Sequence, residues 1–320
     1  MSAKPKTLQQ AIIYFSNPDN CLSFMVERRW PNGVVCPTCG STEVRFLPTR
    51  RLWECKSKHA RKQFSVKVGT IFEDSALPLD KWLIAIWMVS NCKNGVSSYE
   101  VARGLGITQK SAWFMLHRIR LAMQARSLVK LGGPGSEVEV DETFIGGAAR
   151  FMHADKRKRR ITETGSKDKT AVFGIMERGG EVRATVVPNR RKSALHPHIH
   201  ENISAGSAIY SDALMSYQYL TPKYVHKAID HADRYVNGQV HTNGLENFWS
   251  LLKRQLKGTY ISVEPFHLFR YLDEQVFRYN NRKLAHDGFR FEHLSNHLIG
   301  KRLTYAEVTG KVGTTDSLPN

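Results

Sequence analysis

Hydrophobic and polar positions follow several different rhythms along the chain. Residues 1–29 carry apolar positions at roughly helical spacing, which predicts one or two short helices. Residues 30–72 are written in short alternating runs punctuated by Gly and Pro, a pattern typical of short strands and hairpins. Residues 73–130 return to a helical pattern, and its interruption at Gly104-Leu105-Gly106 predicts a helix-turn-helix. The N-terminal part is therefore predicted to be a small β module between helical segments.

A glycine-rich stretch at residues 131–135 (LGGPG) predicts a linker. Strand and helix patterns alternate after it. The strand candidates begin at Glu137, Lys169, Glu181, Ser207 and Tyr224, and the helix candidates span residues 191–203, 243–257 and 265–282. Residues 136–300 are therefore expected to form an α/β domain, a mixed sheet with packed helices. Residues 301–320 are expected to be a polar tail.

The net charge of the chain indicates what kind of partner it binds. The chain has 320 residues, 41% of them hydrophobic, which is enough for a core, but 47 Lys and Arg face only 29 Asp and Glu, giving a net charge of +18. Such an excess indicates a polyanionic partner. No apolar run reaches the roughly 18 to 20 residues of a membrane span, and the N-terminus has no signal-peptide pattern. We expect a cytoplasmic protein with no membrane partner.

Cysteine spacing in the β module predicts a metal site. Cys36 and Cys39 are separated by two residues and followed by Gly40, which is a knuckle able to hold one tetrahedral zinc ion. Cys55 follows 16 positions later, and His59 is the next possible ligand because Lys58 cannot bind zinc. We therefore predict a structural Zn²⁺ site; its ligands would be Cys36, Cys39, Cys55 and His59. The alternative is that Cys55 and His59 are ordinary strand residues beside a chance cysteine pair.

Basic side chains accompany this module, and a metal-supported scaffold could present them to phosphates. They are Arg45, Arg50, Arg51, Lys56, Lys58, Arg61 and Lys62. If the second helix of the helix-turn-helix reads DNA, the residues that open it would face the groove. These are Thr108, Gln109, Lys110, Ser111 and Trp113. The alternative for the charged run is a solvated surface without a partner.

Two aspartates interrupt or end predicted strands that are otherwise apolar. Asp141 interrupts the strand pattern VEVDETFIGG, and Asp212 ends the strand pattern SAIYSDA. Downstream, an amphipathic helix carries Glu246 and, seven residues later on the same face, Lys253. The three carboxylates lie on two strands and one helix that could converge. Their alternative interpretation is that they are surface acids at element ends.

Two other acids flank the first aspartate. Glu139 and Glu142 neighbour Asp141 and are expected to point to the opposite face of the strand. They are therefore not included in the predicted site.

Order and spacing of these acids resemble the ribonuclease-H-like core of DDE transposases and integrases. The strings CPTCG, RKQFSVKVGTIFEDS, VDETFIGG, IYSDA and HTNGLENFWSLLKR more closely resemble bacterial insertion-sequence transposases of family fifteen-ninety-five. This resemblance implies that Asp141, Asp212 and Glu246 are metal-binding catalytic acids and that Lys253 is the accompanying base. Some relatives of this kind use Asn as third residue, so Asn243 and Asn247 stay open as alternatives to Glu246.

Phosphodiester chemistry fits these residue types. Two Mg²⁺ or Mn²⁺ ions held by carboxylates can activate a water or a 3′-hydroxyl and stabilise the leaving oxygen. We therefore expect a transposase that binds the terminal inverted repeats of an insertion sequence, cleaves them and joins them to target DNA. Paired ends imply a homo-oligomer, and a bacterial host implies a place at the nucleoid. The alternatives are a domesticated, catalytically silent DNA-binding regulator and a nuclease without strand transfer.

Overall fold

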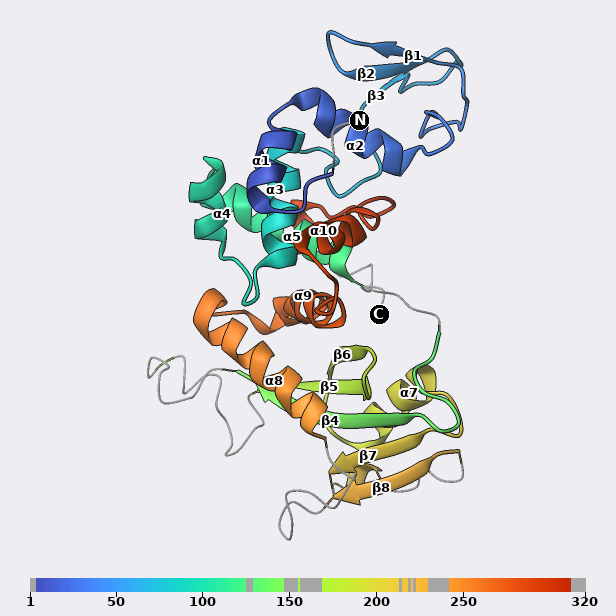
Figure 1. Ribbon diagram of the computed structural model, residues 1–320, viewed down its shortest axis with the longest axis vertical. Coiled ribbons are helices and arrows are strands. Elements are labelled where there is room, and N and C mark those ends of the chain that lie inside the picture. The colour runs from blue at the N-terminus through green and yellow to red at the C-terminus, as the bar shows by residue number, and fades with distance from the viewer. Residues whose placement is uncertain are drawn as a thin grey trace. The chain divides into compact units, whose positions relative to one another are not determined.

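Two compact units make up the computed structural model (Figure 1), which describes residues 4–124, 129–146, 155, 169–212, 215–217, 220, 223–229 and 242–311. Unit 1 comprises Met1–Gln124 together with Lys283–Asn320, and unit 2 comprises Ala125–Arg282. No helix in the described ranges is both long and apolar enough to cross a membrane.

Unit 1 combines helices with a small antiparallel sheet of order β1-β2-β3. Its elements are α1 (Leu8–Phe15), α2 (Pro18–Arg29), β1 (Val44–Leu47), β2 (Leu52–Cys55), β3 (Gln63–Phe64), α3 (Leu79–Asn91), α4 (Ser98–Leu105), α5 (Gln109–Met123), α10 (Asp287–Ser295) and α11 (Tyr305–Val308). The break between α1 and α2 is a cap, since the Asn17 side chain accepts a hydrogen bond from the Asp19 N–H.

The predicted helix-turn-helix is confirmed by α4 and α5. A capping box between Ser97 and Glu100 starts α4, and Gly106 ends it with a left-handed φ of +60°. Thr108 then caps α5 by accepting a hydrogen bond from the Ser111 N–H. The glycine that interrupts the helical pattern is therefore the turn of the motif.

The predicted C-terminal boundary of the second domain, residue 300, is wrong. Residues from Lys283 onward belong to unit 1. Phe291 of α10 packs among aromatic rings, at centroid distances of 5.6 Å from Phe15, 5.3 Å from Phe24 and 4.9 Å from Trp87. The Lys301 ammonium also donates to backbone carbonyls at the end of α5. Apolar side chains such as Phe291 therefore place this mostly polar segment in unit 1. Residues 301–320, predicted to be a polar tail, include the short helix α11.

The predicted linker, residues 131–135, is part of unit 2. Leu131 is buried and forms a parallel bridge with Ile203. The Leu131 N–H donates to the Asn202 carbonyl at 2.7 Å, and the Ser204 N–H donates to the Leu131 carbonyl at 2.9 Å. Glycine is required at position 132, where φ is +77° and an added Cβ would lie 2.4 Å from the Ser207 hydroxyl.

Unit 2 is built on a mixed five-stranded sheet of order β6-β5-β4-β7-β8. Its elements are β4 (Glu137–Ile145), β5 (Thr170–Glu177), β6 (Val182–Val187), α7 (Lys192–Asn202), β7 (Ala208–Asp212), β8 (Val225–Ile229), α8 (Asn243–Gln255) and α9 (Leu268–Asn280). β4, β5 and β6 pair antiparallel, whereas β4, β7 and β8 pair parallel. The predicted α/β fold with a ribonuclease-H-like mixed sheet is confirmed.

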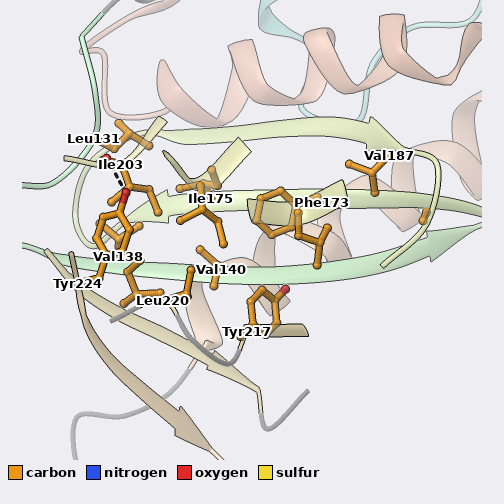
Figure 2. Packing of buried hydrophobic residues seen from close by; sticks show 14 residues of the cluster. Leu131, Val138, Val140, Phe173, Ile175, Val187, Ile203, Tyr217, Leu220 and Tyr224 are labelled. Carbon is orange, nitrogen blue, oxygen red and sulfur yellow. Dashed lines mark hydrogen bonds between the residues drawn. The ribbon is translucent and has the colours of Figure 1, made fainter. Parts of the chain in front are cut away.

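Each face of the sheet has its own core. Val138 and Val140 of β4 meet Phe173 and Ile175 of β5 on the face that α7 covers (Figure 2). The alternate residues point to the other face, where apolar side chains of α8 and α9 pack against Val172 and Met176. In Figure 1, α8 lies across the sheet beside β4 and β5. The sheet is thus a middle layer, and polar residues on the α8 face of β4 meet α8.

Gly174 of β5 lets α8 approach the sheet closely. A Cβ at this position would lie 2.6 Å from the Trp249 ring and 3.0 Å from Leu245, and both side chains belong to α8. We predict that Gly174→Ala lowers the free energy of unfolding by about 1 to 3 kcal/mol, because the core there is already full. Gly258→Ala is the control, since nothing lies within 4 Å of its added Cβ. Chemical denaturation checks this, and equal stability of the two variants would contradict it.

Candidate active site

Asp141 lies in β4 on the face that α8 covers. The indole Nε1 of Trp249 donates a hydrogen bond of 2.9 Å to Asp141 Oδ2, and the Glu142 N–H donates one of 2.8 Å to Asp141 Oδ1. Trp249 is only 4% exposed, so its ring is at once a core residue and a fixed donor. The carboxylate is therefore held from both sides before any ligand binds.

Glu139 fixes the start of α8. It precedes Asp141 by two residues and therefore shares its face of β4, so the prediction that it points the other way is wrong. Its carboxylate accepts a hydrogen bond of 3.0 Å from the Leu245 N–H and pairs with Arg178 at 3.1 Å. Gly244 makes room for it, since a Cβ there would lie 2.7 Å from Glu139 Oε2. A buried acid on the strand thus replaces an N-cap side chain, which Thr242 does not provide.

An open pocket of about 470 Å³ joins β4 to α8. It is lined by Asp141, Glu142, Thr143, Glu246, Trp249, Ser250 and Lys253. The α8 residues among these recur at three- and four-residue intervals and form one stripe of the helix. Neither Asn243 nor Asn247 lines the pocket, so among the residues considered for the third position the structure brings Glu246 to Asp141.

Asp212 ends β7, the parallel neighbour of β4. It does not line the pocket, but its charge acts on both acids of β4. Burial, the charge of Glu142 and, to a smaller extent, the charge of Asp212 together raise the pKa of the Asp141 carboxyl to about 7, against the hydrogen bond from Trp249. Such crowding of half-buried carboxyl groups makes the site favourable for cations.

Glu142 is the member of the site that the sequence missed. It points to the other face of β4, where the buried Tyr217 hydroxyl donates a short hydrogen bond to its Oε2. Burial raises the pKa of the Glu142 carboxyl, and the charge of Asp212 adds to this. Trp249 was also missed as a partner of Asp141. Its place three residues after Glu246 was visible, but that spacing is equally typical of core packing.

The predicted zinc ligands come together in unit 1. The ligand atoms of Cys36, Cys39, Cys55 and His59 all lie within 4.8 Å of one another. Cys36 Sγ is 3.4 Å from His59 Nε2, and Cys39 Sγ is 3.6 Å from Cys55 Sγ. Three thiols and one imidazole are a donor set that suits tetrahedral zinc. Within the described ranges, no other three or more His, Cys, Asp or Glu side chains bring their ligand atoms this close together.

The side chains of unit 1 that are predicted to face DNA differ in their exposure and in their contacts within the protein. All seven basic residues of the β module are exposed, although Arg45 pairs with Glu54 at 2.7 Å and Arg51 with Asp19 at 3.0 Å. At the start of α5, the N-cap Thr108 and Lys110 are exposed, whereas Trp113 lies edge-on against His117 at 4.4 Å. Residues 115–120 are all buried. Only the first turn of α5 is therefore available to a groove.

Two parts of this chain match families of known proteins. Residues 130–280 match the ISXO2-like transposase domain, and residues 16–61 match the transposase zinc-ribbon domain. An uncharacterized protein in transposable element ISH50 of Halobacterium salinarum is 26% identical over 253 residues, 76% of this chain and 84% of the relative. An uncharacterized transposase-like protein of Haemophilus influenzae is 31% identical over 105 residues, 32% of this chain and 85% of the relative. The zinc-ribbon match and the Cys/His cluster together support a structural zinc. The chain therefore belongs to the insertion-sequence transposases of family fifteen-ninety-five.

Proposed function

We propose that this chain cuts the DNA ends of an insertion sequence and joins them to target DNA, using carboxylate-bound metal ions in unit 2. One observation carries the proposal: Asp141 and Glu246 line the same pocket as Lys253, and the charge of Asp212 reaches Asp141. A crowded set of carboxyl groups, of which Asp141 and Asp212 are half-buried and Glu246 is exposed, suits hard divalent cations.

Asp141, Asp212 and Glu246 would hold two Mg²⁺ or Mn²⁺ ions in this site. Bound there, the ions would activate a water or a 3′-hydroxyl and stabilise the leaving oxygen. Trp249 keeps Asp141 in place through its hydrogen bond. Lys253 lies seven residues beyond Glu246 on the same stripe of α8 and contacts a phosphate of the bound strand.

Unit 1 would select the DNA. In this proposal Cys36, Cys39, Cys55 and His59 bind the structural zinc, and the exposed basic residues of the β module contact phosphates. The first turn of α5, with Lys110 and Thr108, enters a groove of the terminal inverted repeat. Two ends must be handled together, so the active form is a homo-oligomer.

A cleavage assay tests the proposal. The purified chain is incubated with Mg²⁺ or Mn²⁺ and duplexes from the flanks of its own gene, beside Asp212→Ala and Glu246→Ala. Glu201→Ala is the matched control, because Glu201 is an exposed acid on α7. We expect cutting by the wild type and the control alone. Binding without cutting by any variant would favour a DNA-binding regulator, and cutting that survives Glu246→Ala would return the third position to Asn243 or Asn247.

Trp249→Phe should reduce cleavage by roughly 10- to 100-fold, because it keeps a ring in the core but removes the donor to Asp141. The loss should be partly recovered at higher Mn²⁺, since the carboxylate is misplaced and not absent. Phe248→Leu is the control for lost packing, because Phe248 is buried on the same helix. Rates measured across a Mn²⁺ titration check this. An equal loss in both variants would mean that Trp249 serves packing alone.

A further inference from the structure

The chain leaves α8 through a strained turn with an exposed apolar tip. α8 continues into one turn of π-helix, Leu256–Tyr260, and Ile261 follows with φ +60° and ψ −57°. These angles are unfavourable for a β-branched residue. Its side chain is nevertheless 83% exposed, more than any other large hydrophobic side chain in the part of the chain that the structure describes. Neither core packing nor backbone preference explains an isoleucine at this position.

Neighbouring contacts hold the turn in this strained shape. The Tyr260 hydroxyl donates a 2.6 Å hydrogen bond to Glu274 Oε1, and the Tyr260 ring meets Tyr271 edge-on at 4.7 Å. Glu274 is fully buried on α9 and also accepts a 3.3 Å hydrogen bond from Gln255 Nε2. Tyr260 is thus anchored to α9, and the next residue, Ile261, is directed into solvent. Strain that is held by such contacts is typical of functional sites.

A polar stripe leads along α8 from the proposed active site to this turn. Glu246, Ser250 and Lys253 are spaced by four and three residues, which places them on one side of α8, and Lys257 follows in the π-helical turn. All four are exposed. Of these residues, Lys257 lies nearest to Ile261 along the chain, four residues before it. Positive charge therefore continues beyond Lys253 up to the apolar tip.

We propose that this turn opens duplex DNA beside the cut: Lys257 binds a backbone phosphate, and Ile261 inserts between neighbouring base pairs. The inference rests on the proposed function, because it concerns the same DNA. Apolar wedges of this kind, including isoleucine, unstack a base step and kink the duplex. A protein partner would need a contiguous apolar area, whereas here a single apolar side chain follows basic ones. Duplex DNA matches this combination, because each base step offers an apolar stacking surface between backbone phosphates.

Helix geometry sets where the opening should occur. Lys257 lies eleven residues beyond Glu246, which corresponds to about 16 Å at a rise of 1.5 Å per residue. With α8 running along the duplex in this proposal, and at roughly 3.4 Å per base pair, this distance spans about five steps. Since Ile261 follows Lys257 by four residues, the unstacked step is expected about five base pairs or slightly more from the phosphate at the proposed metal site beside Glu246.

Fluorescence of 2-aminopurine tests the inference on the full chain. The probe is placed at successive positions near the cleaved end, without Mg²⁺ or Mn²⁺ so that the DNA stays intact. We expect wild type to raise the fluorescence severalfold about five base pairs from the cut position, and Ile261→Gly to lose most of this rise while binding within threefold as tightly. Val225→Ala, at another exposed apolar residue of unit 2, should behave as wild type. Lys257→Ala should reduce the slope of log affinity against log salt by about one.

Stability gives a second readout for the same variant. Ile261→Gly should raise the denaturation midpoint, because glycine accepts this φ without strain. A lowered midpoint would make Ile261 a structural residue and overturn the inference. So would equal fluorescence in wild type and Ile261→Gly, or a change of oligomer mass in that variant. If wild type neither binds nor cuts end DNA, the proposed function fails as well; if it cuts without raising the fluorescence, only the wedge is wrong.

Discussion

Replacing Asp141 by Asn is expected to lower the rate of DNA cleavage by roughly a thousandfold or more. The amide keeps the size of the side chain and can still accept the hydrogen bond from Trp249, but it removes the negative charge that a divalent cation needs. Single-turnover cleavage in Mn²⁺ measures the loss. The Glu201→Gln variant, at an exposed acid on α7, is the control and should keep its rate.

The same substitution should leave unit 2 folded. Asp141 is crowded by Glu142 and Asp212, so a neutral side chain relieves repulsion when no metal is bound. Mn²⁺ should raise the thermal midpoint of wild type, since a ligand of the folded state stabilises it, and should not raise that of Asp141→Asn. An equal rise in both proteins would show that the ions bind elsewhere. Loss of fold in metal-free Asp141→Asn would make the aspartate a structural residue.

Removing zinc is expected to unfold the β1–β3 module and to leave unit 2 intact. The strands of the module bury only Trp53, Cys55 and Phe64, and structural zinc in such small folds contributes roughly 10 kcal/mol or more. Cys36→Ser should have the same effect as chelation, because it removes one of the clustered ligands. Hydrogen exchange along the chain checks both parts: protection should vanish near β1–β3 and persist in β4, β5 and α8.

Cys92→Ser is the matched control for the zinc experiment. Cys92 is half-buried at the end of α3 and does not belong to the cluster, so its replacement should leave the exchange pattern unchanged. Loss of protection in the sheet of unit 2 after chelation would contradict the independence of the two units. DNA-end binding should fall together with the module, because its basic side chains lose their scaffold.

Much of this fold was predictable because its elements have clear local signals. The helix pattern at Leu79–Asn91 and the strand patterns around Asp141 and Asp212 all correspond to elements of the structure. Alternation predicts strands well when one face of each is buried against a helix. Knuckle spacing likewise predicted which side chains meet in unit 1, since two residues between cysteines leave little freedom.

Other features depend on packing that no local pattern records. The placement of α10 in unit 1 follows from Phe291, whose partners lie hundreds of residues earlier in the chain. The hydrogen bond from Trp249 to Asp141 is invisible in the sequence, because tryptophan on the apolar face of a helix is ordinary core. The position of Glu139 was predictable, because residues two apart on a strand point to the same face, and Glu139 precedes Asp141 by two.

The most direct measurement is a joining reaction with the intact chain. Wild type, Mn²⁺, end duplexes and a target plasmid are combined, and the junctions are sequenced. Our proposal predicts element ends cut at the boundary of the repeat and joined through their 3′-hydroxyls to the plasmid, with no product from Asp212→Ala. End duplexes that are bound but left uncut at every Mn²⁺ concentration, or junctions that persist in Asp212→Ala, would contradict it.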